Sequence, residues 1–155
     1  MSCAPTTEIR RAAPHDAGAV RDLVRAAYAI WIPVLGREPM PMKADYERAV
    51  REHQIDVLEI DGDMRGLIET MARPDHLWIE NIAVRPESHG KGLGRRLLAH
   101  AERTAAEAGV AEIRLLTNAA FQSNIALYEK VGYRTDRREA FMGGTTVYMS
   151  KKLDR

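Results

Sequence analysis

The stretch that decides the fold reads Ile82-Ala83-Val84-Arg85-Pro86-Glu87-Ser88-His89-Gly90-Lys91-Gly92-Leu93-Gly94-Arg95-Arg96-Leu97-Leu98. It begins as an apolar strand, breaks at Arg85-Pro86 and continues through alternating glycines into a helix whose apolar residues recur at helical spacing. Glycines at such a turn let successive backbone N–H groups point at one spot. The first helical turn adds free N–H donors and the positive end of the helix dipole. The stretch therefore predicts an anion site, usually for phosphate, with added positive charge from Lys91, Arg95 and Arg96.

Neither of two familiar phosphate-binding sequences fits this loop. The P-loop requires Ser or Thr after its lysine, and none follows Lys91 here. The dinucleotide fingerprint requires G-x-G-x-x-G, whereas the spacing here is G-x-G-x-G. A Gly-rich turn that only starts a helix is the alternative interpretation. Alternating glycines are costly in chain entropy for a plain turn, which favours the phosphate interpretation.

The loop resembles the acyl-CoA pyrophosphate loop of the GNAT superfamily of acyl-CoA-dependent N-acyltransferases, which reads Gln/Arg-x-x-Gly-x-Gly/Ala. His89 stands where Gln or Arg is usual, and this weakens only a role for that side chain, since the loop works mainly through backbone N–H groups. The resemblance implies acetyl-CoA as cofactor. It implies binding by the loop residues His89, Gly90, Lys91, Gly92, Leu93, Gly94 and Arg95, and by the backbone of the preceding strand at Ile82, Ala83 and Val84.

Composition limits the class of protein. A chain of 155 residues, 45% hydrophobic and 29% charged, suits one soluble globular domain, and we expect a single domain over residues 1–155. The net charge of +1 predicts no general attraction to nucleic acid or membranes. The single cysteine, Cys3, excludes an internal disulfide and lies in a tail, residues 1–7, that we expect to be disordered. Neither a membrane span nor a signal peptide is recognisable, so a cytoplasmic protein is expected.

The order of predicted elements indicates a mixed α/β fold. A short strand at Glu8–Ala12 precedes a helix that Pro14 opens and Pro33 stops, and a second helix covers Lys43–Arg51. The later elements are strands at Ile55–Ile60, Met64–Met71 and Leu77–Val84, a helix to about Ala108, a strand at Glu112–Leu116, a short helix from Ser123 or Asn124, and strands at Tyr133–Phe141 and Thr145–Lys152. A helical crossover should make Glu112–Leu116 parallel to Leu77–Val84. This agrees with a GNAT-type seven-stranded, mostly antiparallel sheet with about four helices, splayed between its fourth and fifth strands.

A second motif follows in the right order. Asn118 and then Asn124, Tyr128, Gly132 and Tyr133 resemble the family signature Asn-x-x-Ala-x-x-x-Tyr-x-x-x-Gly-Phe/Tyr in its loose form. Asn124 and Tyr128 lie one helical turn apart and so share a face. The resemblance implies cofactor contacts from both asparagines and from Tyr128, whose phenol would protonate the leaving thiolate. Alternatively, Asn124 is only an N-cap and Tyr128 a core residue with a wet tip.

The general base is less evident. Glu80 is the first choice because it stands in an otherwise apolar strand, where partial burial would raise its pKa toward the working pH. Glu69 on the neighbouring strand is a second candidate, a solvent-facing or arginine-paired Glu80 is the structural alternative, and a water chain could replace a single base. The five histidines show no metal-ligand spacing, so no metal is expected.

The sequence does not identify the amine acceptor. Ile32–Met42 carries unusual apolar surface for a loop-like segment, and we expect Trp31, Ile32 and Glu80 to contact the substrate. The leading hypothesis is acetyl transfer to the primary amine of a small molecule, peptide or protein. A non-catalytic acyl-CoA-binding module is the alternative, and a plain interaction domain is a third. A homodimer through the C-terminal strands is a further hypothesis.

Overall fold

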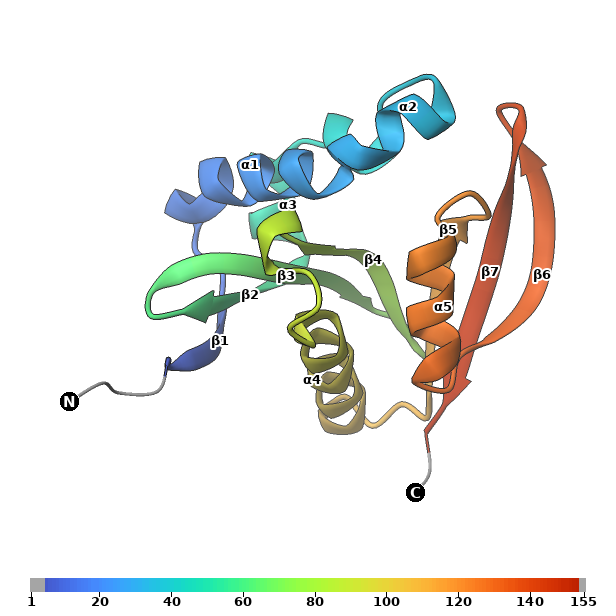
Figure 1. The fold of residues 1–155 in the computed structure, drawn as a ribbon. Helices are drawn as coiled ribbons and strands as arrows, with labels where there is room; N and C mark the ends of the chain where they lie inside the picture. The colour runs from blue at the N-terminus through green and yellow to red at the C-terminus, as the bar shows by residue number, and fades with distance from the viewer. Residues whose placement is uncertain (1–4, 154–155) are drawn as a thin grey trace. The chain divides into compact units, whose positions relative to one another are not determined.

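The computed structural model describes residues 5–153 and contains a seven-stranded mixed sheet in the order β1-β2-β3-β4-β5-β7-β6 (Figure 1). The strands are β1 Thr7–Arg11, β2 Gln54–Ile60, β3 Asp63–Ala72, β4 Leu77–Val84, β5 Glu112–Asn118, β6 Arg134–Phe141 and β7 Gly144–Lys152. The α-helices are α1 Ala17–Tyr28, α2 Ile32–Leu35, α3 Tyr46–Glu52, α4 Leu93–Glu107 and α5 Gln122–Lys130. Short 3-10 helices are η1 Pro14–Asp16, η2 Ala29–Trp31, η3 Met40–Lys43 and η4 Pro86–Ser88. The predicted α/β class and mostly antiparallel sheet are confirmed.

The chain divides into two compact units, residues 5–69 with 81–97 and residues 70–80 with 98–153. In the first unit, β1 pairs antiparallel with β2, from Thr7 opposite Ile60 to Arg11 opposite Asp56. Helix α1 buries one face, which carries Val20, Leu23, Val24 and Ala27 at helical spacing. Strand β2 is buried through its middle because both of its faces are covered.

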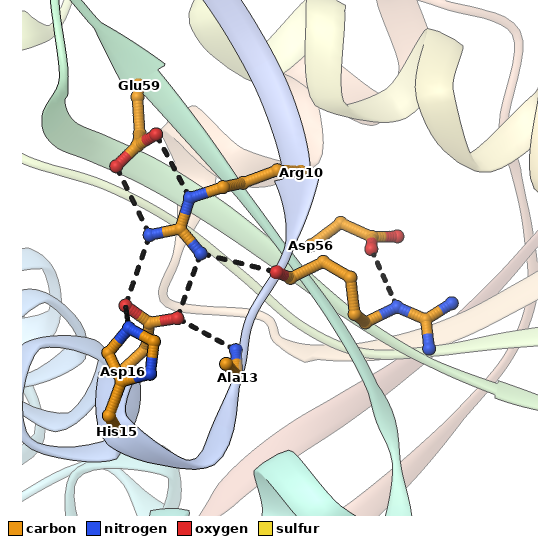
Figure 2. A network of polar contacts seen from close by, with 7 residues as sticks. Arg10, Ala13, His15, Asp16, Asp56 and Glu59 are labelled. Carbon is orange, nitrogen blue, oxygen red and sulfur yellow. Dashed lines mark hydrogen bonds and ion pairs between the residues drawn. The ribbon is translucent and has the colours of Figure 1, made fainter.

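A network of charged groups joins β1, β2 and the start of the first helical segment (Figure 2). The Arg10 guanidinium forms a forked pair with Asp16 at 2.8 and 3.1 Å and a second with Glu59 at 3.0 and 3.2 Å. The Asp16 carboxylate also accepts the Ala13 N–H at 2.7 Å. The hydrogen bonds from Arg10 lower the pKa of the buried Asp16 carboxyl from 3.8 to about 2. The network therefore fixes where η1 and α1 leave the sheet.

In the second unit, β4 and β5 are parallel, in register from Leu77–Ile113 to Ile79–Leu115. This confirms the predicted crossover. Strands β5 and β7 pair antiparallel, and β6 returns along β7 as a hairpin with a register shift between Thr135 and Arg137. The sheet order leaves β6 at one end, and all eight of its residues are exposed.

Three expectations about the N-terminal half need correction. Thr6 and Thr7 are ordered, since the Thr6 N–H donates to Asp61 and Thr7 begins β1, so the tail expected over residues 1–7 is wrong for these two; residues 1–4 lie outside the described residues. Pro33 does not stop a helix but sits in the first turn of α2, where its missing N–H costs nothing. The segment Ile32–Met42 is accordingly not a plain loop, because α2 and most of η3 lie in it.

Candidate active site

The glycine loop between β4 and α4 lies in the first unit. Gly90 and Gly92 adopt φ values of 81° and 76°, which side chains rarely tolerate, and a Cβ placed on either would meet no protein atom within 4 Å. The Arg96 N–H donates to the Gly92 carbonyl at 3.2 Å, so the helix begins directly at the second of these glycines. The N–H groups of Leu93, Gly94 and Arg95 belong to the first turn, where no intrahelical acceptor exists. Backbone donors and open space thus coincide at this turn.

Around these donors the charge is positive and the supporting contacts are specific. Lys91, Arg95 and Arg96 are all exposed. The Ser88 side chain is buried, and its hydroxyl accepts a hydrogen bond from Arg65 at 3.0 Å, which ties the loop to β3. An anion at this turn would meet the backbone N–H groups of the turn, with exposed cationic side chains around them.

One edge of β4 carries a second set of backbone donors. The Arg85 N–H donates to the Arg65 carbonyl at 2.9 Å, and strand alternation then directs the Ala83 N–H to β3 as well. The N–H and C=O groups of Ile82 and Val84 point to the opposite edge. There the Tyr28 hydroxyl lies 3.3 Å from the Ile82 carbonyl, and His89 Nε2 lies 3.2 Å from the Val84 carbonyl. The predicted group of Ile82, Ala83 and Val84 is therefore divided. The Ala83 N–H points to β3, and only Ile82 and Val84 present N–H groups at the opposite edge.

In the second unit, Tyr128 is the one buried residue of α5. Its ring lies 5.9 Å from that of Tyr133, centroid to centroid, and the Tyr133 N–H donates to the Tyr128 carbonyl at 2.9 Å. Burial raises the pKa of Tyr128 well above its usual range, so the phenol keeps its proton at ordinary pH. Gly132, with φ of 105°, makes the turn that brings Tyr133 back beside Tyr128. The arrangement holds a neutral phenol as a hydrogen-bond donor.

The two predicted asparagines play different local parts. Asn118 Oδ1 accepts the Ala120 N–H at 2.9 Å, so this side chain closes the turn after β5. Helix α5 begins at Gln122, not at Ser123 or Asn124, and its N-cap residue is Phe121. Asn124 is therefore not the N-cap; it is half-buried in the first turn of the helix, one turn before Tyr128.

The candidate bases differ from expectation. Glu80 is exposed, so the expected partial burial is wrong: on β4 the buried positions are Leu77, Ile79, Asn81 and Ala83, and Glu80 points the other way. Glu69 is buried, and its carboxylate lies 2.6 Å from His53 Nδ1. No group of three or more His, Cys, Asp or Glu residues able to hold a metal occurs among residues 5–153.

The predicted acceptor residues Trp31 and Ile32 lie where η2 meets α2, and both are half-buried. Ile30, Val34 and Met40 in the same region are exposed, with 48%, 57% and 56% of their surface accessible. The sequence interpretation missed Asn81, a buried amide that contacts residues on both sides of this segment. The sequence did indicate that Asn81 is buried, because it follows the same alternation as the buried residues Leu77, Ile79 and Ala83.

Comparison with known proteins agrees with this architecture. Over 73 residues the chain is 37% identical to the [ribosomal protein bS18]-alanine N-acetyltransferase of Escherichia coli K12, a match that covers 47% of this chain and 49% of the relative. The chain thus spans about half the length of the curated relatives that it matches.

No helix within residues 5–153 has the length and apolar character to cross a membrane.

Solved structures share the fold over nearly the whole chain. An N-acetyltransferase, PaiA, from Thermoplasma acidophilum in complex with coenzyme A superposes with a TM-score of 0.81 at 18% identity, covering 96% of this chain and 99% of that one. The ribosomal-protein-S18-alanine N-acetyltransferase of Escherichia coli gives a TM-score of 0.80 at 23% identity, covering 97% and 96%. A family model described as the Acetyltransferase (GNAT) family matches residues 19–133, which include the glycine loop and Tyr128. The chain belongs to the GNAT acetyltransferase family.

Proposed function

We propose that this chain is an N-acetyltransferase that transfers an acetyl group from acetyl-CoA directly to a primary amine. The observation that carries the proposal is the glycine loop, where left-handed glycines, the free N–H groups of the first turn of α4 and open space occur together. Such a turn suits a pyrophosphate, and Lys91 and Arg95 would add charge without fixing geometry. Family membership and relatives bound to coenzyme A support acetyl-CoA as the donor.

The strand edge supplies the next role. The N–H groups of Ile82 and Val84 share one edge of β4, and the carbonyls on that edge are contacted by Tyr28 and His89. Backbone donors in fixed positions stabilise the oxyanion that forms when an amine attacks a thioester. In this proposal the acyl oxygen binds there, and Ala83 contributes only through the ladder with β3.

Tyr128 takes the role of general acid. The amine nitrogen forms a bond to the acyl carbon, the carbon–sulfur bond breaks, and the sulfur takes a proton from the phenol, which recovers one from solvent. The amine gives up its surplus protons to the base and to water. A high pKa keeps the phenol protonated before the step, so that its proton is available to the departing sulfur.

The base in this proposal is Glu80 or water. An exposed Glu80 still suits this role, because a carboxylate can attract an ammonium acceptor. The buried Glu69 is less suitable, since its carboxylate is engaged by His53. Substrate contacts from Trp31, Ile32 and Glu80, and cofactor contacts from Asn118 and Asn124, remain predictions.

The acceptor class is proposed from the relatives. The Escherichia coli relative acts, by its name, on an alanine of a ribosomal protein, so a peptide with a free amino-terminal alanine is the first acceptor to test. We further propose that the 155 residues act as one domain in the cytoplasm. A homodimer through the exposed strand β6 remains a prediction that light scattering would check.

The test is calorimetric titration of acetyl-CoA into the wild-type protein and the Gly92→Val variant. It is followed by turnover on an alanine-initiated peptide, a lysine peptide and a short alkyl diamine. Binding lost in the variant, together with release of free coenzyme A thiol that requires an amine, supports the proposal. Binding without turnover on the panel supports the non-catalytic module instead. No heat with either protein, and no change in melting temperature, overturns both.

A further inference from the structure

A buried amide on β4 holds two tyrosines at once. Asn81 Oδ1 accepts the Tyr28 hydroxyl at 2.7 Å, and Asn81 Nδ2 donates to the Tyr46 hydroxyl at 3.2 Å. The Tyr46 hydroxyl in turn donates to the Pro41 carbonyl at 2.7 Å. All three side chains are buried, with 3% of Asn81, 9% of Tyr28 and 3% of Tyr46 accessible. Buried hydrogen bonds of this kind are costly to break, because each lost partner leaves a desolvated polar group.

The two tyrosines flank a single segment of the chain. Tyr28 is the last residue of α1, and Tyr46 is the first residue of α3. Residues 29–45 lie between them and contain η2, α2 and η3, so both ends of this segment are hydrogen-bonded to one side chain. Arg25 adds a bond to the Met42 carbonyl at 2.9 Å, within the same segment.

Within this segment only Pro39 and Met42 are buried. Ile30, Val34 and Met40 are exposed, Trp31 and Ile32 are half-buried, and Pro33 is exposed. Apolar side chains held on short helices, and not packed away, form a surface suited to contacting a ligand. The Tyr28 hydroxyl also lies 3.3 Å from the Ile82 carbonyl, on the strand edge that carries the proposed acyl-binding N–H groups.

We infer that Asn81 is a positioning residue that fixes residues 29–45 against β4, and that this sets the place of the amine acceptor beside the acyl group. The inference rests on the proposed function for its consequence in catalysis, but the anchoring itself does not. Asn81 touches neither substrate in this arrangement. It acts through Tyr28 and Tyr46, so its loss should weaken use of the amine and leave acetyl-CoA binding at the glycine loop intact.

The experiment compares Asn81→Ala, Tyr28→Phe and Tyr46→Phe with a matched control, Tyr133→Phe. The Tyr133 hydroxyl is buried but has no hydrogen-bond partner among the described residues, so its removal costs no such bond. If Asn81→Ala does not fold, the two conservative tyrosine variants still break the network one bond at a time. Each protein is measured by hydrogen exchange and by steady-state kinetics with acetyl-CoA and whichever panel amine the wild type uses best.

We expect exchange within residues 29–45 to accelerate about fivefold or more, the factor set by one lost hydrogen bond, while exchange in β2 stays unchanged. The KM for the amine should rise by a similar factor, with the dissociation constant of acetyl-CoA unchanged and Tyr133→Phe like wild type. Unchanged exchange in the segment overturns the anchoring. Equal losses for amine and acetyl-CoA overturn the positioning role and indicate general structural damage. If the wild type turns over no amine, the proposed function fails while the exchange result still decides the anchoring.

Discussion

Replacing Gly92 by alanine separates the backbone role of the glycine loop from its ligand role. Gly92 has φ of 76°, and Gly62 in the β2–β3 turn has φ of 81°; an added Cβ meets no protein atom within 4 Å at either position. The two substitutions should therefore cost the same stability, about 1–2 kcal/mol each, because only the left-handed backbone opposes the new side chain. Gly62→Ala is thus a matched control for Gly92→Ala.

The affinity for acetyl-CoA should distinguish them. At Gly92 the added methyl group occupies the open space in front of the N–H groups at the start of α4, where we place the pyrophosphate. Losing one hydrogen bond to a charged ligand costs about 1.5–3 kcal/mol, which is roughly a 10- to 150-fold loss of affinity. The Gly62 turn lies outside that loop, so its variant should bind acetyl-CoA as the wild type does.

The assay is calorimetric titration of acetyl-CoA, with urea unfolding of each variant in parallel. Equal destabilisation with a tenfold or greater affinity loss only in Gly92→Ala is the expected result. Wild-type affinity in Gly92→Ala would refute the placement of the phosphate at this turn. Equal affinity losses in both variants would show that stability, and not the loop, controls binding.

Three further outcomes follow from the geometry. Tyr128→Phe should lower kcat at least about 100-fold, as loss of a general acid does, and leave the dissociation constant of acetyl-CoA within about twofold, measured by stopped assays and calorimetry. The folded pKa of Asp16 lies below its unfolded value, so its pairing with Arg10 contributes roughly 2 kcal/mol above pH 4, and this is lost as pH falls toward 2. Urea unfolding between pH 6 and 2 should accordingly show a weaker acid dependence in Asp16→Asn. Tyr133→Phe should raise the unfolding free energy by up to about 1 kcal/mol, because its hydroxyl is buried without a partner; a lower melting temperature would contradict this.

Local chemistry made much of the fold predictable. Strand β4 has the predicted bounds, since a run of apolar residues ends at Arg85-Pro86. Helix α4 ends at Glu107, close to the predicted end at about Ala108, and the following Gly109 has φ of 76°. Between the predicted strands Ile55–Ile60 and Met64–Met71, Asp61 and Gly62 both adopt positive φ, as a tight hairpin requires. Such features depend on neighbouring residues alone.

What the sequence could not settle depends on contacts between distant residues. Pro33 is compatible with either the end of a helix or its first turn, and in the structure it lies in the first turn of α2. Strand β4 contains two adjacent polar residues, Glu80 and Asn81, and from the sequence Glu80 is the one expected in an unusual environment. The alternation of the strand in fact buries Asn81 and exposes Glu80. Tyr28 and Tyr46 read as apolar positions on helices, and nothing in their spacing indicates that one amide joins them.

The side chains, the backbone edge and the C-terminal end of β4 are assigned different roles. The proposals for Asn81 and for Gly92 can therefore be tested independently of one another. Its buried side chains fix neighbouring elements, as Asn81 does for residues 29–45. Its edge opposite β3 presents the N–H groups of Ile82 and Val84, and its C-terminal end leads into the glycine loop. Under these proposals, a substitution at Asn81 should affect use of the amine and one at Gly92 should affect binding of the pyrophosphate, and neither removes the backbone donors. If the two variants raise different kinetic constants, the strand works as three separable surfaces. If each raises both constants equally, β4 responds as a single unit, and the assignment of separate roles to its residues fails.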